Sequence, residues 1–83
     1  MIPKDIENIH ILQAVKEIDF NGIPTRRDSR KYLVQIGDTL YPPKYVVSIA
    51  NKYLTGKELD SADFIATEAR TYLEKLNYKI VKK

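Results

Sequence analysis

Apolar residues recur every three or four positions near the start of the chain, which predicts an amphipathic helix. The apolar stripe consists of Ile11, Leu12, Val15 and Ile18. Asn8 can cap this helix at its start, and we expect the helix to run to about Asp19. The Asn21-Gly22 pair then ends it and Pro24 prevents its continuation, so residues 23–29 are expected to form a basic loop.

Apolar and polar positions alternate over residues 30–36, which is typical of a strand. Gly37-Asp38 is a two-residue hairpin turn, and residues 39–41 can return as the second strand. The expected register pairs Ile36 with Thr39 and Val34 with Tyr41.

A second amphipathic helix is expected over residues 44–55. Pro42-Pro43 suits the start of a helix, and Gly56 suits a left-handed residue just past its end. The apolar stripe of this helix is formed by Val46, Ile49, Ala50 and Tyr53. Its opposite, polar side is formed by Lys44, Ser48, Asn51, Lys52 and Thr55.

The last third of the chain predicts a helix and a strand. A connector over residues 59–64, anchored by Phe64, leads to a helix over residues 66–76. Asn77 can adopt the left-handed conformation that ends it, and residues 78–81 form the closing strand. The inward-facing residues of the helix are Ala69, Tyr72, Leu73 and Leu76. The order α-β-β-α-α-β predicts one α+β domain over residues 1–83, with three helices on a three-stranded antiparallel sheet.

The composition fits one small folded domain. The chain has 83 residues, of which 43% are hydrophobic, and this apolar content is enough to offset chain entropy. There is no cysteine, which excludes disulfides and thiolate metal sites. No apolar run is long enough for a signal peptide or a membrane span, so we expect a soluble, cytoplasmic protein without a membrane partner.

The residues that most enzymes require are missing. His10 is the only histidine, so a two-histidine metal motif or a His/Cys nucleophile pair is impossible within the chain. The three glycines are isolated, so no phosphate-binding loop can be formed. Glu58, Asp60 and Asp63 could hold a hard cation, but their spacing does not match a calcium loop and a helix-capping role is favoured. We therefore expect no catalytic residue, no metal and no cofactor.

The net charge of +3 conceals an uneven distribution of charge. Residues 21–57 carry seven basic against two acidic residues, and four of the six tyrosines lie in the same segment. A basic segment with interleaved aromatic residues is typical of proteins that bind nucleic acids. The alternative is that the charges serve solubility and that the tyrosines pack in the core.

If the partner is DNA, two sets of side chains are expected to contact it. Phosphate contacts and hydrogen bonds are expected from Arg26, Arg27, Arg30, Lys31, Lys44, Ser48, Asn51 and Lys52. The tyrosines that could stack on bases, where they are exposed, are Tyr32, Tyr41 and Tyr45.

Nearly the whole chain resembles a known domain family. The residues that carry the resemblance are the run from Ser29 to Val34, Gly37, the run from Tyr41 to Tyr53 (YPPKYVVSIANKY), Gly56, Glu58-Leu59 and Asp63-Phe64. They are similar to the N-terminal head domain of modification-dependent (type IV) restriction proteins, such as McrA-like HNH endonucleases and McrB-like GTPase subunits. Many relatives have a Gly-Gly-Glu turn after the Asp-Phe pair, whereas this chain has Ile65-Ala66-Thr67-Glu68 and retains only the glutamate.

The resemblance implies a non-catalytic target-recognition module that helps to hold DNA, including methylated or otherwise modified duplexes. It also implies a downstream nuclease or GTPase domain or subunit, so that these residues form one domain of a larger protein or a stand-alone relative. The alternative is a protein–protein docking or dimerisation module of the same kind of defence protein. On that interpretation Leu33 and Leu40 remain exposed as an apolar patch on the sheet.

Overall fold

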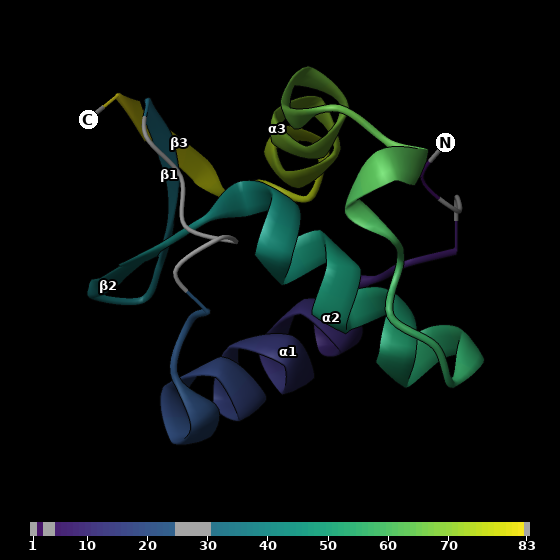
Figure 1. The fold of residues 1–83 in the computed structure, drawn as a ribbon. Helices are drawn as coiled ribbons and strands as arrows, with labels where there is room; N and C mark the ends of the chain where they lie inside the picture. Colours follow the sequence, from purple (N-terminus) through teal and green to yellow (C-terminus); the bar gives the residue numbers. More distant parts are fainter. Residues whose placement is uncertain (1, 3–4, 25–30, 83) are drawn as a thin grey trace.

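Three helices lie on one side of a three-stranded sheet in the computed structural model (Figure 1), which describes residues 2, 5–24 and 31–82. The elements in chain order are α1 (Asn8–Asn21), β1 (Tyr32–Ile36), β2 (Thr39–Tyr41), α2 (Pro43–Thr55), the 3-10 turn η2 (Ser61–Asp63), α3 (Ala66–Lys75) and β3 (Lys79–Lys82). The strand order is β2-β1-β3 with both pairs antiparallel, so the predicted α+β architecture is confirmed.

Helix α1 begins one residue earlier than the capping prediction requires. Glu7, not Asn8, is the capping residue, and the backbone N–H of Glu7 donates to His10 Nδ1 at 2.9 Å. Asn8 lies inside the helix, and its Oδ1 accepts a hydrogen bond from the Tyr78 hydroxyl. The helix ends as expected, because Gly22 has a φ of 80° and its N–H donates to the Ile18 carbonyl at 2.7 Å.

The buried face of α1 differs from the predicted stripe, because Ala14 is buried in place of Leu12 and Val15 is only half-buried. Ile11, Ala14 and Ile18 are buried, whereas the Leu12 side chain is 51% exposed. Helix α1 packs on α2, and the fully buried Ala14 lies between Ile11 and Ile18 on the buried face. Leu12 lies about 200° around the helix axis from Ala14, so its side chain points away from this face.

The hairpin has the predicted register. Val34 pairs with Tyr41 and Ile36 with Thr39. Gly37 has a φ of 64°, the positive value that the tight turns of two-residue hairpins require at their first position. β1 also pairs with β3, and this pairing closes the sheet with the C-terminal strand.

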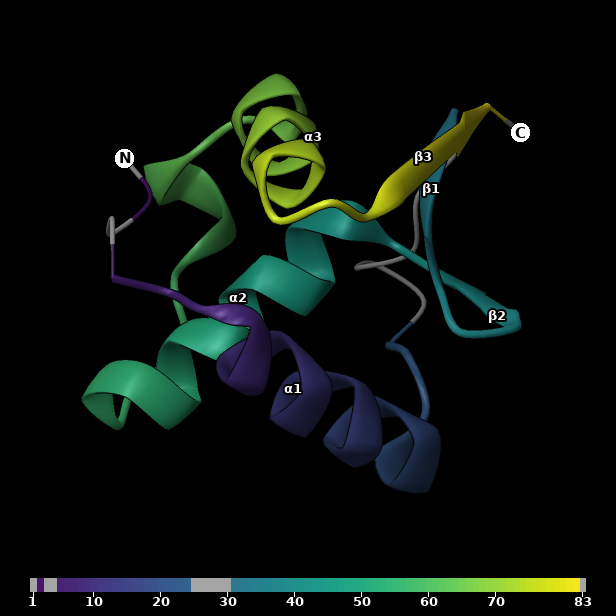
Figure 2. The same ribbon diagram turned by 180° about the vertical axis from the view of Figure 1, so that it is seen from behind.

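Helix α2 is buried on more sides than an amphipathic helix would be. Both figures place it between α1 and α3 (Figures 1 and 2), and the two helices contact it on different sides. The predicted polar position of Ser48 and Asn51 is wrong, since they are 0% and 5% exposed. The predicted apolar residue Tyr53 is instead 39% exposed. A helix enclosed by several elements loses the one-sided pattern from which its buried face would be predicted.

The connector after α2 explains the burial of its polar residues. This connector returns along the helix, where the Leu59 N–H donates to the Ser48 carbonyl at 3.2 Å and Asn51 Nδ2 donates to the Lys57 carbonyl at 2.9 Å. Gly56 has the expected left-handed conformation, with a φ of 92°. The Asn51 side chain therefore fastens the connector to the helix that precedes it.

The last third of the chain follows the prediction closely. Phe64 is 3% exposed, as expected of an anchor, and Asp60 caps η2 by accepting the Ala62 N–H at 2.9 Å. Ala69 and Leu73 are buried on the inner face of α3, and Asn77 has a φ of 72°. None of the described helices is both long and apolar enough to cross a lipid bilayer.

Candidate nucleic-acid interface

The described part of the predicted DNA-binding set is smaller than the full set. Arg26, Arg27 and Arg30 lie outside the described residues, so their contact with DNA stays a prediction. The structure describes the other predicted residues, which are Lys31, Lys44, Lys52, Ser48, Asn51 and the three tyrosines. These side chains do not form one surface.

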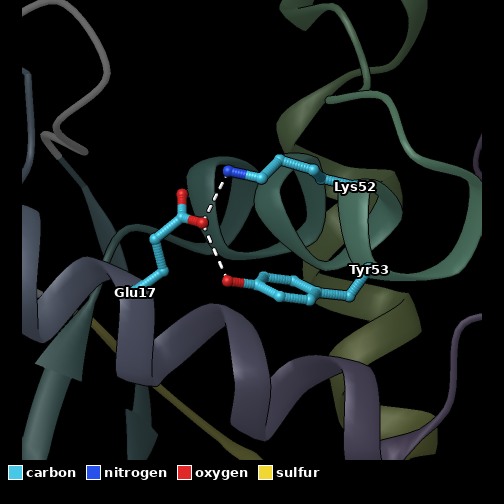
Figure 3. A network of polar contacts seen from close by, with 3 residues as sticks. All are labelled: Glu17, Lys52 and Tyr53. Atoms are coloured by element: carbon cyan, nitrogen blue, oxygen red, sulfur yellow. Dashed lines mark hydrogen bonds and ion pairs between the residues drawn. The ribbon is translucent and has the colours of Figure 1, made fainter.

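Lys52 is held by a carboxylate of the neighbouring helix. Its Nζ lies 2.6 Å from Glu17 Oε1, and the Tyr53 hydroxyl donates to the same oxygen at 2.8 Å (Figure 3). The hydrogen bond from Lys52 lowers the pKa of Glu17, and the same bond raises the pKa of Lys52. A phosphate would have to compete with Glu17 for this ammonium group.

Ser48 and Asn51 are structural residues of α2. Asn51 Nδ2 donates to the Lys57 carbonyl at 2.9 Å and to Thr55 Oγ1 at 3.3 Å. With 0% and 5% exposure, neither Ser48 nor Asn51 has the accessible surface that a hydrogen bond to DNA requires. The predicted role depended on a solvated polar side of α2, which the connector covers.

Two of the three predicted stacking tyrosines belong to the core. Tyr41 is 3% exposed, and its hydroxyl donates to Asp19 Oδ1 at 2.7 Å. Burial, reinforced by this hydrogen bond, raises the pKa of Tyr41. Tyr45 is half-buried and packs against the hydrophobic core. The exposure on which stacking depends is therefore missing at Tyr41 and reduced at Tyr45.

Tyr32, a predicted stacking residue, lies close to two cations that the sequence analysis did not include in the DNA-binding set, Arg70 and Lys82. The Arg70 guanidinium carbon lies 3.9 Å from the centroid of the Tyr32 ring, a stacked cation–π arrangement. One guanidinium nitrogen also donates to Thr67 Oγ1 at 3.2 Å, one turn earlier in α3. The exposed Lys82 pairs with Tyr32 across β1 and β3, and the exposed Lys31 directly precedes it. We call these four residues, Lys31, Tyr32, Arg70 and Lys82, the Tyr32 cluster.

The positive charges of the Tyr32 cluster are not neutralised by any acidic side chain that the structure describes. Within the described part of the chain, neither Lys31, Arg70 nor Lys82 forms an ion pair with an acidic side chain. Side chains of directly paired strand residues lie on the same face of a sheet, so Lys82 lies on the face that carries Tyr32. Helix α3 and strand β3 thus bring Arg70 and Lys82 to Tyr32, and Lys31 adds a third positive charge next to Tyr32 in the chain.

No pattern in the sequence would have found Arg70. It lies next to the inward-facing Ala69 in a helix whose approach to β1 is decided by tertiary packing. The stack on Tyr32 joins residues 38 positions apart, and neither helical nor strand periodicity connects them.

A second cation lies over an aromatic ring beside the same helix. Lys44 Nζ is 4.8 Å from the centroid of the Phe64 ring, and Phe64 ends the connector that leads into α3. Figures 1 and 2 both show the first turn of α2, which carries Lys44, between the sheet and α3. Lys44 is half-buried, so its side chain contributes to the packing of this region as well as a positive charge.

A cavity of about 670 Å³ lies between α3 and the segment before α1. Its described lining consists of Ile2, Ile6, Glu7, Thr67, Glu68, Thr71, Tyr72, Lys75 and Leu76. Tyr72 is the single aromatic residue of this lining, and its hydroxyl donates to the Ile6 carbonyl at 2.8 Å. The described lining is therefore not the aromatic cage that a flipped base requires.

The glutamate retained from the Gly-Gly-Glu turn has a local structural role. Glu68 lies in the first turn of α3, and its Oε1 accepts the backbone N–H of Ile65 at 3.1 Å. This bond satisfies an N–H that the start of a helix leaves without a partner, and its negative charge suits the positive end of the helix dipole. The two glycine positions of the turn are occupied here by Ala66 and Thr67, which continue the helix.

Comparisons with known proteins define the family of this domain. Neither the curated proteins nor the solved structures gave a significant match. A family model described as "ScoMcrA-like, N-terminal head domain" matches residues 4–82, a span that includes every helix and strand from α1 to β3. The resemblance to McrA-like restriction proteins is thereby confirmed, and the chain belongs to the ScoMcrA-like N-terminal head domain family.

Proposed function

We propose that this domain is a non-catalytic module that holds DNA for a modification-dependent restriction protein, and that it does so through the Tyr32 cluster. The observation that carries the proposal is the Arg70 guanidinium carbon 3.9 Å from the centroid of the Tyr32 ring, with Lys82 paired to Tyr32 across the sheet and Lys31 next to it in the chain. Membership of the head domain family supports the link to a restriction protein.

The three cations of the Tyr32 cluster suit contacts with a phosphate backbone. Each phosphate that a lysine or arginine neutralises releases counterions, so the binding constant falls by about one log unit per log unit of salt and per contact. Arg26, Arg27 and Arg30 precede Lys31 in the chain, and we propose that they extend the same contact surface. Lys44, over the Phe64 ring, supports the neighbouring first turn of α2.

A charge-reversal experiment with a matched control tests the proposal. The triple variant Lys31→Glu, Arg70→Glu, Lys82→Glu and the control Lys16→Glu, Lys57→Glu, Lys75→Glu change the net charge by the same amount. In a fluorescence-anisotropy titration with a labelled duplex, we expect the first variant to lose at least about tenfold in affinity and the control to lose much less. Equal losses would show that only the overall charge matters.

Two further variants protect this test against a folding artefact. Arg70→Gln alone removes one charge and the guanidinium while keeping a side chain that can lie on Tyr32, so its thermal midpoint should stay close to that of the parent. A triple variant Arg26→Glu, Arg27→Glu, Arg30→Glu tests the predicted loop without touching the described core. Unchanged duplex affinity in both variants would contradict the proposal.

The partner domain belongs to the same proposal. Head domains of this family are named for McrA-like proteins, and we propose that a nuclease or GTPase domain or subunit acts on the DNA that this domain holds. The full-length gene product tests this point directly. A downstream catalytic domain whose DNA cleavage or nucleotide hydrolysis weakens when the Tyr32 cluster is reversed would support it, and unchanged activity would contradict it.

A protein-docking role is the second candidate function, because α1 exposes large apolar side chains. Ile9, Leu12 and Phe20 are 60%, 51% and 88% exposed, and Leu40 on β2 is 43% exposed. Exposed apolar groups on one element are a feature of protein-binding surfaces. Light scattering coupled to size-exclusion chromatography distinguishes the two functions: a dimer without DNA affinity at low salt would favour docking.

A further inference from the structure

The described tyrosines form contacts within the domain, and Tyr53 among them keeps 39% of its surface exposed. The hydroxyls of Tyr41, Tyr53, Tyr72 and Tyr78 donate to Asp19, Glu17, the Ile6 carbonyl and Asn8, respectively. Tyr45 packs against the core, Phe64 is 3% exposed, and Tyr32 is covered by Arg70. Phe20 is 88% exposed, but it lies in the last turn of α1, which both views place at the opposite end of the molecule from the start of β1 (Figures 1 and 2).

We infer that the Tyr32 cluster binds the phosphodiester backbone and not a base, so that this domain binds modified and unmodified duplex DNA with the same affinity. The inference rests on the proposed DNA binding and names the part of the DNA that is recognised. Contacts to the backbone position a protein on a duplex but carry no direct information about its bases.

The stacked arginine is arranged for a phosphate. A guanidinium carries five N–H donors in one plane, and here a single hydrogen bond, to Thr67 Oγ1 at 3.2 Å, is made by the described residues. The Tyr32 ring supports the flat side of that plane, which leaves the edge of the half-buried group for the oxygens of a ligand. A planar fork of donors matches two phosphate oxygens, whereas a lysine provides only a point charge.

Arg70 occupies one face of the Tyr32 ring, 3.9 Å from the centroid, so a base can stack on that face only if this arginine is displaced. Lys82 pairs with Tyr32 across the sheet, and Lys31 precedes Tyr32 in the chain; both add positive charge, which attracts phosphates of any sequence. Tyr32 is thus a positioning residue that acts through Arg70.

The cavity beside α3 does not supply the missing base contact. Its described lining includes the carboxylates of Glu7 and Glu68, which repel a DNA backbone, and a single ring, that of Tyr72. A flipped base is normally held between aromatic or apolar faces in a pocket that its backbone can approach. Of these two described sites, the Tyr32 cluster is therefore the one suited to a phosphate.

Three duplexes of one sequence test the inference. They carry cytosine, 5-methylcytosine or 5-hydroxymethylcytosine at the same positions, and each is titrated with the unaltered chain at several salt concentrations. We expect the three dissociation constants to agree within about twofold, because backbone contacts dominate. Arg70→Gln should weaken all three by the same factor and reduce the salt slope by about one unit.

A double-mutant cycle separates the positioning role of Tyr32 from base stacking. If the ring acts only through Arg70, Tyr32→Leu costs no more affinity than Arg70→Gln, and the double variant Tyr32→Leu, Arg70→Gln costs no more than Arg70→Gln alone. Lys79→Gln, on the same strand as Lys82 but on the other face of the sheet, serves as the control for a single lost charge. Thermal midpoints measured for all variants identify any loss that comes from unfolding.

The outcomes separate the two claims. A preference above about tenfold for a modified duplex overturns the inference and leaves the proposed DNA binding intact. A larger loss from Tyr32→Leu than from Arg70→Gln, in a folded variant, also overturns it by showing base stacking. The absence of binding to every duplex at low salt overturns the proposed function itself.

Discussion

Lys52 Nζ of α2 lies 2.6 Å from Glu17 Oε1 of α1, and this ion pair joins the two longest helices of the described chain. The Tyr53 hydroxyl adds a second hydrogen bond to the same carboxylate oxygen, at 2.8 Å. We expect Glu17→Gln to lower the thermal midpoint by a few degrees at neutral pH, because the neutral amide keeps an acceptor but loses the charge. Calorimetry or circular dichroism measures the shift. Glu74→Gln, which removes an exposed carboxylate of α3, should leave the midpoint nearly unchanged.

The same pair predicts how stability depends on pH. The pKa of Glu17 is lowered in the folded chain from its ordinary value of 4.5, chiefly by the hydrogen bond from Lys52. A lowered folded pKa means that this stabilisation is present above the ordinary pKa and is lost as the pH falls through the folded one. The midpoints of the parent and Glu17→Gln should therefore start to converge as the pH falls below the ordinary value of 4.5, and should meet once it is below the folded pKa. A difference that persisted in strong acid would contradict this assignment.

The hydrogen bond from the Tyr41 hydroxyl to Asp19 joins the hairpin to α1. Tyr41 is 3% exposed, whereas Asp19 is exposed, so removal of the hydroxyl leaves a carboxylate that water can solvate. We expect Tyr41→Phe to cost about 1 kcal/mol in the free energy of unfolding, the usual net value of one such bond. Tyr41→Ala should cost about 3–5 kcal/mol because it also empties a core position. Urea denaturation distinguishes the two, and equal effects would show that the ring contributes little.

The elements and their order could be predicted because their signals are local. Gly37, Gly56 and Asn77 have the positive φ values that their places at turns and helix ends suggested. The alternation over β1 and the two-residue turn determined the register of the hairpin, which needs no knowledge of the helices. Prediction worked wherever a residue and its immediate neighbours decide the conformation.

The candidate site could not be predicted to the same extent, because it depends on which elements meet. Charge alone placed Lys52 in the DNA-binding set, and only the packing of α1 on α2 shows that Glu17 engages it. Arg70 was missed because its partner Tyr32 lies in a strand, and no local pattern in the sequence indicates that this strand approaches α3. The helical pattern predicted a solvated position for Ser48 and Asn51, but the connector after α2 lies over them.

Leu12 and Ile11 provide a matched test of the revised buried face of α1. The two residues are adjacent, but Ile11 is 0% exposed and Leu12 is 51% exposed. Ile11→Ala should lower the free energy of unfolding by about 2–5 kcal/mol, as expected of a fully buried aliphatic side chain. Leu12→Ala should cost less than about 1 kcal/mol, since little of its surface is removed from water. Similar losses in chemical denaturation would contradict the burial of only one of them.

Asn51→Ala tests whether this residue serves the fold or the DNA. The substitution removes the donor to the Lys57 carbonyl at 2.9 Å and to Thr55 Oγ1, so the connector after α2 loses one of its attachments to the helix. We expect a loss of about 1–2 kcal/mol in the free energy of unfolding and faster amide exchange in residues 56–59. The duplex affinity of the folded variant should be unchanged. A weaker affinity at constant stability would restore the direct DNA contact that burial argues against.

A comparison of Lys52→Ala with Lys31→Ala tests whether local pairing decides which lysines contact DNA. Lys31 is exposed and lies beside the Arg70–Tyr32 stack, whereas the Lys52 ammonium is engaged by Glu17. Each substitution removes one positive charge, so any long-range effect of net charge on the affinity is the same. Lys31→Ala should reduce the salt slope of duplex binding by about one unit, while Lys52→Ala should leave the slope unchanged and lower the thermal midpoint instead. Equal slopes would mean that Lys52 leaves Glu17 when DNA is bound, and the surface that holds DNA would then extend from the Tyr32 cluster to α1.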